Sequence, residues 1–234
     1  MILFFTTVIR AAPLAAGGEL VSLDWDRKEV RARAPISPLD TSIRDENPRG
    51  NSRGGRGIWL TADTVFAAAY DGVLLFDYAL NSTGSLSNVL MAGLHEVLMT
   101  SPGRLWITAT ALDAALEIDL SNSVVTREHW PREIPAFQKH FQITSLPIDK
   151  AVDQRTAFLS QAHTNQPGHL HLNALGNWRG GTIALLNRFG AVVDLDRGEI
   201  LMSDPVLRGG HNLIVRGDTP VSYTHLTLPT ILRV

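Results

Sequence analysis

A repeat of strand-like segments with a period of about 40 residues is the feature that most constrains this fold. The segments LDWDRKEV and VDLDRGEI match at Asp24 and Asp194 and at the charged positions that follow, and looser copies surround Asp77 and Asp119. In each copy an acidic residue ends a strand, a short turn follows, and the next strand begins. An aspartate at that position can accept turn N–H groups, as in an Asx-turn.

The segments that open each unit repeat as well. HEVL, LNAL and HNLI align as a polar residue followed by two apolar ones, and Asn173 and Asn212 in this alignment are 39 residues apart. A period near 40 with four strands in each unit is typical of a β-propeller blade. We therefore predict an all-β fold, a β-propeller of four-stranded blades. Over about residues 1–220 the sequence resembles the YVTN, NHL and WD-repeat-like superfamily.

The repeat also predicts where the blades lie. We expect them at about residues 1–35, 54–91, 93–130 and 169–207, with the start of another at residue 211. The first blade has no predicted innermost strand, and in propellers a C-terminal strand usually completes such a blade. The interval 131–168 lacks the strand pattern, so we expect a loop and helix insertion there, with a helix over residues 149–159 capped by Asp149. A degenerate blade is the alternative.

The final residues do not follow the repeat. Residues 221–230, VSYTHLTLPT, resemble the translation of a transposase-derived sequencing adapter in one reading frame. We therefore expect natural sequence to stop near Pro220, residues 221–234 to be a non-native tail, and the propeller to be incomplete at its C-terminus. The alternative is a genuine strand that closes the fold.

Composition argues against several kinds of function. The formal net charge of −2 over 234 residues gives no basic footprint for nucleic acid or an anionic membrane. The chain has no cysteine, which excludes disulfides and thiolate chemistry and fits a cytoplasmic protein. The opening apolar run, ILFFTTVI, follows no basic residue, so we expect a buried strand rather than a signal peptide. We expect the full-length protein to be a cytoplasmic monomer.

Polar residues gather where the repeat units open. The innermost strand of each propeller blade faces the central channel, so these side chains should converge at the channel mouth. We therefore predict a ligand-binding or interaction site there, for a small molecule or a protein. The polar positions are Glu96, Asn173 and Asn212, and the histidines beside them are His95, His169, His171 and His211.

One interpretation of this group is a metal site. Carboxylate and amide oxygens of Glu96, Asn173 and Asn212 suit a hard cation such as calcium. The arrangement is similar to calcium-dependent six-bladed propellers of the gluconolactonase and paraoxonase type, which implies a lactonase or hydrolase activity. The aspartate that accompanies these ligands in that family is not found here. His169 and His171 alternate on one predicted strand face, a spacing that permits joint metal ligation.

The histidines give a second enzymatic hypothesis. His95, His171 and His211 can act as acid–base or transfer groups, because imidazoles titrate near neutral pH. The arrangement resembles arylsulfotransferase-type propellers, in which channel histidines matter, although the fuller motif of that family is absent. In the remaining alternative these side chains are structural and hydrogen-bond neighbouring strands and turns. The sequence leaves open whether the protein is an enzyme.

Overall fold

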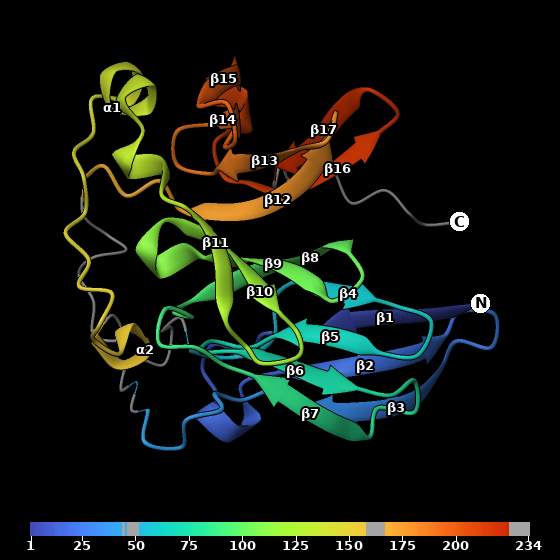
Figure 1. Cartoon of the computed structure of the whole chain (residues 1–234). Helices are drawn as coiled ribbons and strands as arrows, with labels where there is room; N and C mark the ends of the chain where they lie inside the picture. The colour runs from blue at the N-terminus through green and yellow to red at the C-terminus, as the bar shows by residue number, and fades with distance from the viewer. Residues whose placement is uncertain (44, 46–51, 158–166, 225–234) are drawn as a thin grey trace.

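The chain forms a series of antiparallel sheets, as the computed structural model in Figure 1 shows. The structure describes residues 1–43, 45, 52–157 and 167–224. Each sheet is built from strands that are consecutive in the sequence, and within a sheet each strand hydrogen-bonds to the strand before it and the strand after it. This simple up-and-down order is the one that antiparallel hairpins produce.

Three sheets have four strands each and fall within the intervals 54–91, 93–130 and 169–207. The first contains β4 (Ile58–Leu60), β5 (Val65–Ala68), β6 (Val73–Phe76) and β7 (Ser82–Leu86). The second contains β8 (Leu94–Ser101), β9 (Arg104–Ala109), β10 (Ala114–Asp119) and β11 (Val125–His129). The third contains β12 (Leu172–Trp178), β13 (Gly181–Leu186), β14 (Ala191–Asp194) and β15 (Glu199–Ser203).

The two ends of the described chain form smaller sheets. A three-stranded sheet contains β1 (Ile2–Thr6), β2 (Glu19–Asp24) and β3 (Glu29–Pro35), and a hairpin contains β16 (Gly210–Arg216) and β17 (Thr219–Thr224). Among the described residues β1 pairs with β2 alone, and residues 4–6 of β1 line the same cavity as the first strands of the other sheets. β1 therefore takes the innermost position, and the prediction that this blade lacks its innermost strand is wrong. β17 takes in residues 221–224 of the adapter-like stretch, and residues 225–234 lie outside the described ranges. The non-native origin of that stretch stays a prediction.

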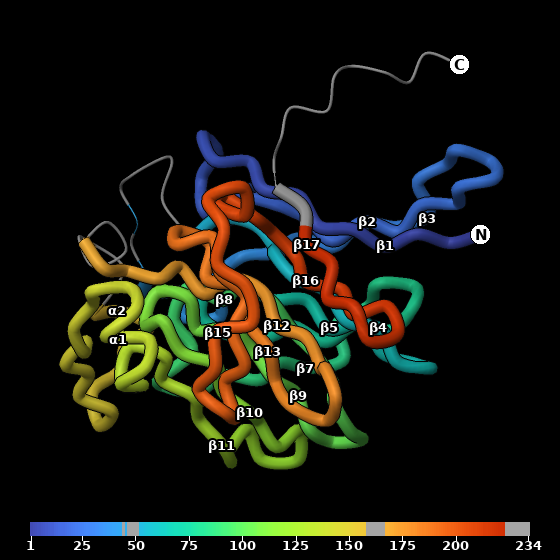
Figure 2. The backbone as a smooth tube through the Cα atoms, turned by 90° about the horizontal axis from the view of Figure 1, so that it is seen from above, coloured from blue at the N-terminus to red at the C-terminus, as the bar shows by residue number. Residues whose placement is uncertain are grey.

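Neighbouring sheets meet through their first strands. β8 contacts β4 on one side and β12 on the other, and β12 contacts β16 in turn. Figure 2, which views the molecule from above, shows β8, β12 and β16 side by side. Successive sheets whose first strands converge are the blades of a β-propeller. The predicted fold class is therefore confirmed.

The acidic residue that ends a strand in each repeat acts as predicted. The Asp24 carboxylate accepts the N–H groups of Asp26 and Arg27, and the Asp194 carboxylate accepts the N–H of Arg197. The aspartates of the two looser copies accept the N–H of the residue two positions later. The repeat is thus a repeat of turn chemistry, in which each carboxylate satisfies backbone donors that the hairpin leaves unpaired.

The apolar core lies between sheets rather than in one central mass. One buried cluster joins β4–β7 with β8–β11 and includes Leu105 and Leu116, both fully buried. A second joins β8–β11 with β12–β15 around Trp106, which is 1% exposed. Two smaller clusters join β1–β3 with β4–β7 and β12–β15 with the β16–β17 hairpin. Each sheet therefore depends on its neighbours to bury its apolar faces.

The interval 131–168 holds the predicted helical insertion. It contains α1 (Pro135–Phe141) and α2 (Gln154–Ala157), which lie beside the sheets at the left of Figure 1. α1 buries Phe137 in the cluster between β8–β11 and β12–β15. The Gln154 N–H donates to the Val89 carbonyl at 2.8 Å and ties α2 to the link between β7 and β8. No helix within the described ranges is long and apolar enough to cross a membrane.

The predicted helix over residues 149–159, with Asp149 as its N-cap, is wrong in its start. Asp149 accepts the Ala151 N–H at 3.0 Å in a turn, and the helix begins at Gln154. Asp153 takes the capping role, because its carboxylate accepts the Arg155 N–H at 3.0 Å and also pairs with the Arg155 guanidinium at 2.6 Å. Residues 158 and 159 lie outside the described ranges.

The substitution Leu116→Ala tests the shared core. Leu116 is 0% exposed between two sheets, so truncation should lower the free energy of unfolding by about 2–5 kcal/mol. Val124→Ala is the control, because Val124 is 51% exposed and its truncation should change stability by less than about 0.5 kcal/mol. Urea denaturation followed by circular dichroism measures both. Equal effects of the two substitutions would contradict the described core.

Candidate functional site

A cavity of about 780 Å³ lies where the first strands of the sheets converge. Residues 4–6 of β1 form one wall, and Gly57 and Ile58 form another. Every sheet in the described ranges contributes to the lining, and five of the predicted site residues meet in it. The charged and hydrogen-bonding side chains beyond β1 are Arg10, Arg56, His95, Glu96, Asn173, His211 and Asn212.

The predicted polar residues sit at bulges in the first strands of three successive sheets. The pairing register of β8 shifts across His95 and Glu96. The registers of β12 and β16 shift at Asn173 and Asn212 in the same way. A bulge leaves its extra residue outside the strand ladder and re-aims its side chain. Repetition of the bulge therefore directs polar side chains from three sheets toward one axis.

The bulge in β8 is held from both sides. On the neighbouring strand β9, the Thr108 hydroxyl accepts the N–H groups of His95 and Glu96 at 3.2 and 2.9 Å. From the preceding sheet, the Gly57 N–H donates to the His95 carbonyl at 2.7 Å. A side chain at position 57 would place its Cβ 2.5 Å from Glu96 Oε1, so glycine is required beside this carboxyl group.

The Glu96 carboxyl group is poised for proton exchange. Burial raises its pKa to about 7, against the opposing effect of a hydrogen bond from the Val97 N–H at 3.1 Å. Near neutral pH the group is therefore divided between its charged and neutral forms. A carboxyl group with this pKa can act as either a proton donor or a proton acceptor.

His171 joins the edge of this site through His95. The two rings contact each other edge to face, with centroids 4.9 Å apart. Burial, followed by the charge on His169, lowers the pKa of His171 to about 3. Burial also lowers the pKa of His95, and the Arg56 guanidinium adds to that shift. Both imidazoles are therefore neutral near pH 7, and each can donate one hydrogen bond and accept another.

Asn173 links two neighbouring sheets at the cavity wall. Its Nδ2 donates to the Gly210 carbonyl at 3.0 Å and lies 3.2 Å from His211 Nδ1. Its Oδ1 is buried and has no hydrogen-bond partner among the described residues. A buried acceptor without a donor costs about 1–3 kcal/mol. A ligand that donates a hydrogen bond here would therefore stabilise the protein.

His169 lies behind the cavity rather than in its lining. Its Nε2 is 3.0 Å from the Thr110 carbonyl and 3.3 Å from the Asp113 carboxylate, and burial lowers its pKa to about 4. The prediction that His169 and His171 share one strand face is wrong. Both residues precede β12, and His171 has a left-handed backbone with φ of 53°.

The buried Asp113 causes this departure from strand geometry. Its carboxylate accepts the N–H groups of Leu170 and His171 at 2.8 and 2.9 Å, which removes those donors from any strand ladder. Arg132, at the start of the insertion, lies 3.7 Å from the same carboxylate. Burial raises the pKa of Asp113 to about 7, against these contacts, which favour the charged form. Asp113 thus joins both ends of the insertion to the β9–β10 turn and orients His171 toward His95.

Asp113 was not identifiable as a site residue from its sequence neighbourhood. It follows an apolar run and sits in a tight turn with φ of 54°, as a residue in an ordinary hairpin does. Its partners are 57 and 58 residues away in sequence. One signal in the sequence could have indicated its role, namely an acidic residue inside an otherwise apolar segment. A carboxylate that is buried with such a segment needs hydrogen-bond donors.

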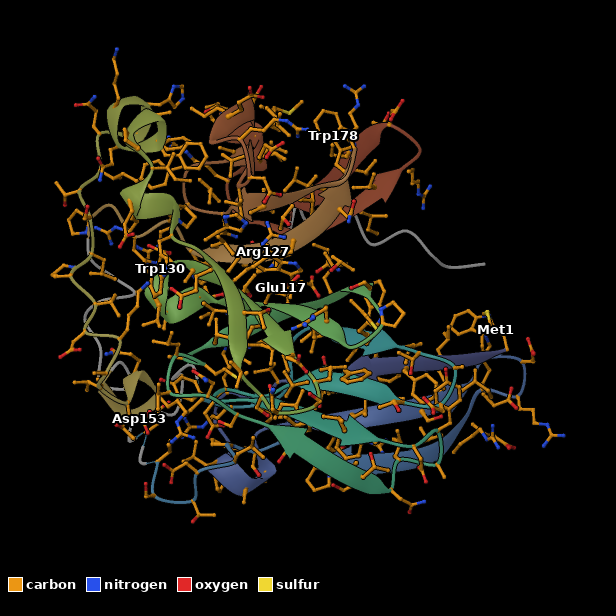
Figure 3. The ribbon with its side chains drawn as sticks, in the orientation of Figure 1. Met1, Glu117, Arg127, Trp130, Asp153 and Trp178 are labelled. Carbon is orange, nitrogen blue, oxygen red and sulfur yellow. The ribbon has the colours of Figure 1, made fainter. Side chains whose placement is uncertain are left out.

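A smaller cavity of about 420 Å³ lies between β8–β11 and β12–β15. Figure 3 shows two of its lining residues, Glu117 and Arg127, near the boundary of these sheets. The Arg127 guanidinium pairs with the Asp196 carboxylate at 2.7 Å, and Asp196 also accepts the Thr182 N–H at 2.6 Å. These groups join one sheet to the next, so we assign this cavity a structural role.

The described lining of the central cavity does not fit a calcium ion. Calcium takes six to eight oxygen ligands, with carboxylates prominent among them. Glu96 is the single carboxylate among the described lining residues, and Asn173 commits its amide nitrogen to the neighbouring sheet. Within the described ranges, no group of three or more His, Asp or Glu side chains is arranged to hold a metal ion.

No protein-family model and no curated protein matches this sequence. Solved structures match it in fold. The WD40 domain of Pan2 from Neurospora crassa gives a TM-score of 0.51 at 12% identity, over 88% of this chain and 46% of that one. Virginiamycin B lyase from Staphylococcus aureus gives 0.51 at 8% identity, over 97% and 76%. A catalytically inactive form of that lyase with quinupristin gives 0.50 at 8% identity, over 92% and 64%.

These similarities establish the fold alone, because the sequence identities are low. The chain spans less than half of the Pan2 domain. One neighbour is a WD40 domain and another is a lyase, so proteins of this architecture include both binding domains and enzymes. The chain is a β-propeller.

The substitution Asp113→Asn tests the positioning of His171. It removes an acceptor for a buried N–H and the negative charge beside Arg132. The free energy of unfolding should fall by about 3 kcal/mol or more. The imidazole NMR signals of His95 and His171 should also shift, because the segment that places His171 loses its anchor.

Asp71→Asn is the matched control. Asp71 is 0% exposed and accepts the N–H groups of Leu39 and Asp40, both at 2.8 Å, so it anchors a different segment in the same way. The control should lose stability without moving the signals of His95 and His171. Equal changes in these signals in both variants would show that Asp113 has no specific positioning role.

The substitution Glu96→Gln should stabilise the protein in a pH-dependent way. The folded-state pKa of about 7 lies above the ordinary glutamate value of 4.5, so ionisation of Glu96 lowers stability as pH rises between these values. Glutamine resembles the neutral form. The gain should be small near pH 4.5 and reach at most about 3 kcal/mol at pH 8. Thermal denaturation of both proteins across this range measures it, and a constant difference would refute the assigned pKa.

Proposed function

We propose that this β-propeller binds a small polar molecule in its central cavity. The observation that carries the proposal is the bulge repeated in β8, β12 and β16. Each bulge interrupts the hydrogen-bond ladder of its strand. Packing of the sheets does not require this interruption, because regular strands would bury the same apolar faces. Bulges of this kind occur next to binding and catalytic sites, where they re-aim a side chain. Three of them around one cavity are best explained by a ligand.

The size and chemistry of the cavity favour a small molecule over a protein surface. Small-molecule sites typically have volumes of about 300–1,000 Å³ and a few convergent polar groups, and this cavity has about 780 Å³. The neutral imidazole of His95 offers one donor and one acceptor in the lining. Asn173 Oδ1 offers a buried acceptor. These groups suit a ligand that has several hydrogen-bonding atoms.

A second candidate function is acid–base catalysis on the bound molecule. It is favoured by the pKa of about 7 for Glu96, close to the value that is best for proton transfer at neutral pH. The fold neighbour virginiamycin B lyase is an enzyme by its name. His95 and His171 could also serve the histidine-dependent transferase reaction that the sequence suggests. Both imidazoles are neutral, so each has a lone pair available for the transfer step. Binding without turnover would support the first candidate over this one.

Histidine NMR gives a direct test of the binding site. A library of small polar compounds would be added to the protein while the imidazole signals are recorded. Compounds that bind should shift the signals of His95, His171 and His211. His129 and His140 lie outside the cavity lining and serve as internal controls. A set of binders that moves only these control signals would contradict the proposed site.

Two matched variants strengthen this test. Asn212 and Ser123 both have left-handed backbones, with φ of 58° and 59°, so glycine fits either position without strain. Asn212→Gly removes a side chain from the cavity and should weaken binding at least about fivefold, the loss of about one hydrogen bond. Ser123→Gly lies outside the cavity lining and should leave affinity unchanged. Isothermal titration with one binder from the library compares the two.

A further inference from the structure

We infer that the ligand of the central cavity carries an anionic group, a carboxylate or a phosphate, which the guanidinium groups of Arg10 and Arg56 recognise. This inference rests on the proposed function and names the class of molecule that the same site takes.

Arg10 and Arg56 lie in segments next to two different sheets and line the same cavity. Arg10 belongs to the connection between β1 and β2, and Arg56 lies just before β4. The main chain of Arg56 is fixed on both sides, because its N–H donates to the Ala68 carbonyl at 3.1 Å and its carbonyl accepts the Thr6 hydroxyl at 2.7 Å. The fold therefore holds the main chain of Arg56 at the wall of the cavity.

Cationic side chains outnumber carboxylates among the described residues that line the cavity. Two guanidinium groups face one carboxyl group among the described lining residues, and burial holds the pKa of that carboxyl, Glu96, near 7. Burial lowers the pKa of Arg56 to about 10, and the charge of Arg10 adds to the shift. The charge of Arg56 also lowers the pKa values of His95 and His171. These like charges repel one another, and an anion bound beside them would reduce that repulsion.

Guanidinium groups match carboxylate and phosphate in shape as well as charge. The planar fork of an arginine donates two parallel hydrogen bonds to a pair of anionic oxygens. Phe5, 41% exposed, and Ile58 add apolar surface to the same cavity. An organic acid, with an anionic head and an apolar body, fits this combination better than a bare inorganic anion does.

Probes of one shape and different charge test the inference. Benzoate and phenyl phosphate each carry a phenyl ring and an anionic head, and benzamide replaces the head of benzoate with a neutral amide. Titration calorimetry on the full chain should give affinities at least about tenfold higher for an anionic probe than for benzamide. The difference should shrink at 0.5 M NaCl, since salt screens partly exposed charges. Tighter binding of phenyl phosphate or of benzoate identifies which anionic group the site prefers.

Three variants separate the arginines from general changes in charge. Arg10→Gln should weaken binding of the preferred anionic probe at least about fivefold and leave benzamide unchanged. Arg56→Gln should do the same, and Arg10→Gln keeps the test valid if Arg56→Gln fails to fold, because Arg10 lies in an exposed connection. Arg31→Gln, on the exposed part of β3, is the control and should have no effect.

The outcomes distinguish this inference from the proposed function. If benzamide binds as tightly as the anionic probes and shifts the His95 and His211 signals, the cavity binds ligands and the anionic inference is wrong. If an anionic probe binds equally well to the Arg10→Gln, Arg56→Gln and Arg31→Gln variants, the assignment to the two arginines is also wrong. If no probe or library compound shifts the cavity histidines, both the inference and the proposed function are overturned.

Discussion

The contact between first strands of neighbouring sheets is the constraint on which the rest of the structure depends. Each sheet leaves apolar faces that only the next sheet can bury, so the clusters of core residues lie between sheets. Packing in this manner brings one strand of every sheet to a common axis. Side chains that these strands direct toward the axis therefore lie together in the central cavity. The cavity and its chemistry follow from the way in which the sheets are buried.

Bulges decide which side chains enter that space. A regular strand alternates its residues between two faces, and both faces of a blade are used for packing. An extra residue at the bulge is free of that alternation, and its backbone groups need other partners. In β8 the Thr108 hydroxyl supplies an acceptor for His95 and Glu96. The polar site is therefore built on the same backbone hydrogen-bonding rules as the strands around it.

The sequence predicted the features that repeat and the helical insertion that interrupts them, and it missed contacts between distant segments. The aspartates at strand ends and the shared position of Glu96, Asn173 and Asn212 recur with the period of the blades, so one copy explains the others. Asp113 acts through contacts with a segment far away in the chain, which no local pattern reveals. His169 and His171 were misplaced because their backbone geometry is set by such a contact rather than by strand propensity.

Two polar groups at the cavity are held in states that lower the stability of the fold. Burial raises the pKa of the Glu96 carboxyl group, and Asn173 Oδ1 has no donor among the described residues. A site shaped only by folding would replace such groups with apolar ones, because burial of a polar group is destabilising unless hydrogen bonds or charges compensate for it. In the proposed complex, an acidic molecule with hydrogen-bond donors would donate to Asn173 Oδ1 and pair with the arginines that line the cavity. Relief of these unfavourable terms would contribute to affinity, since any ligand that binds the folded state alone stabilises it.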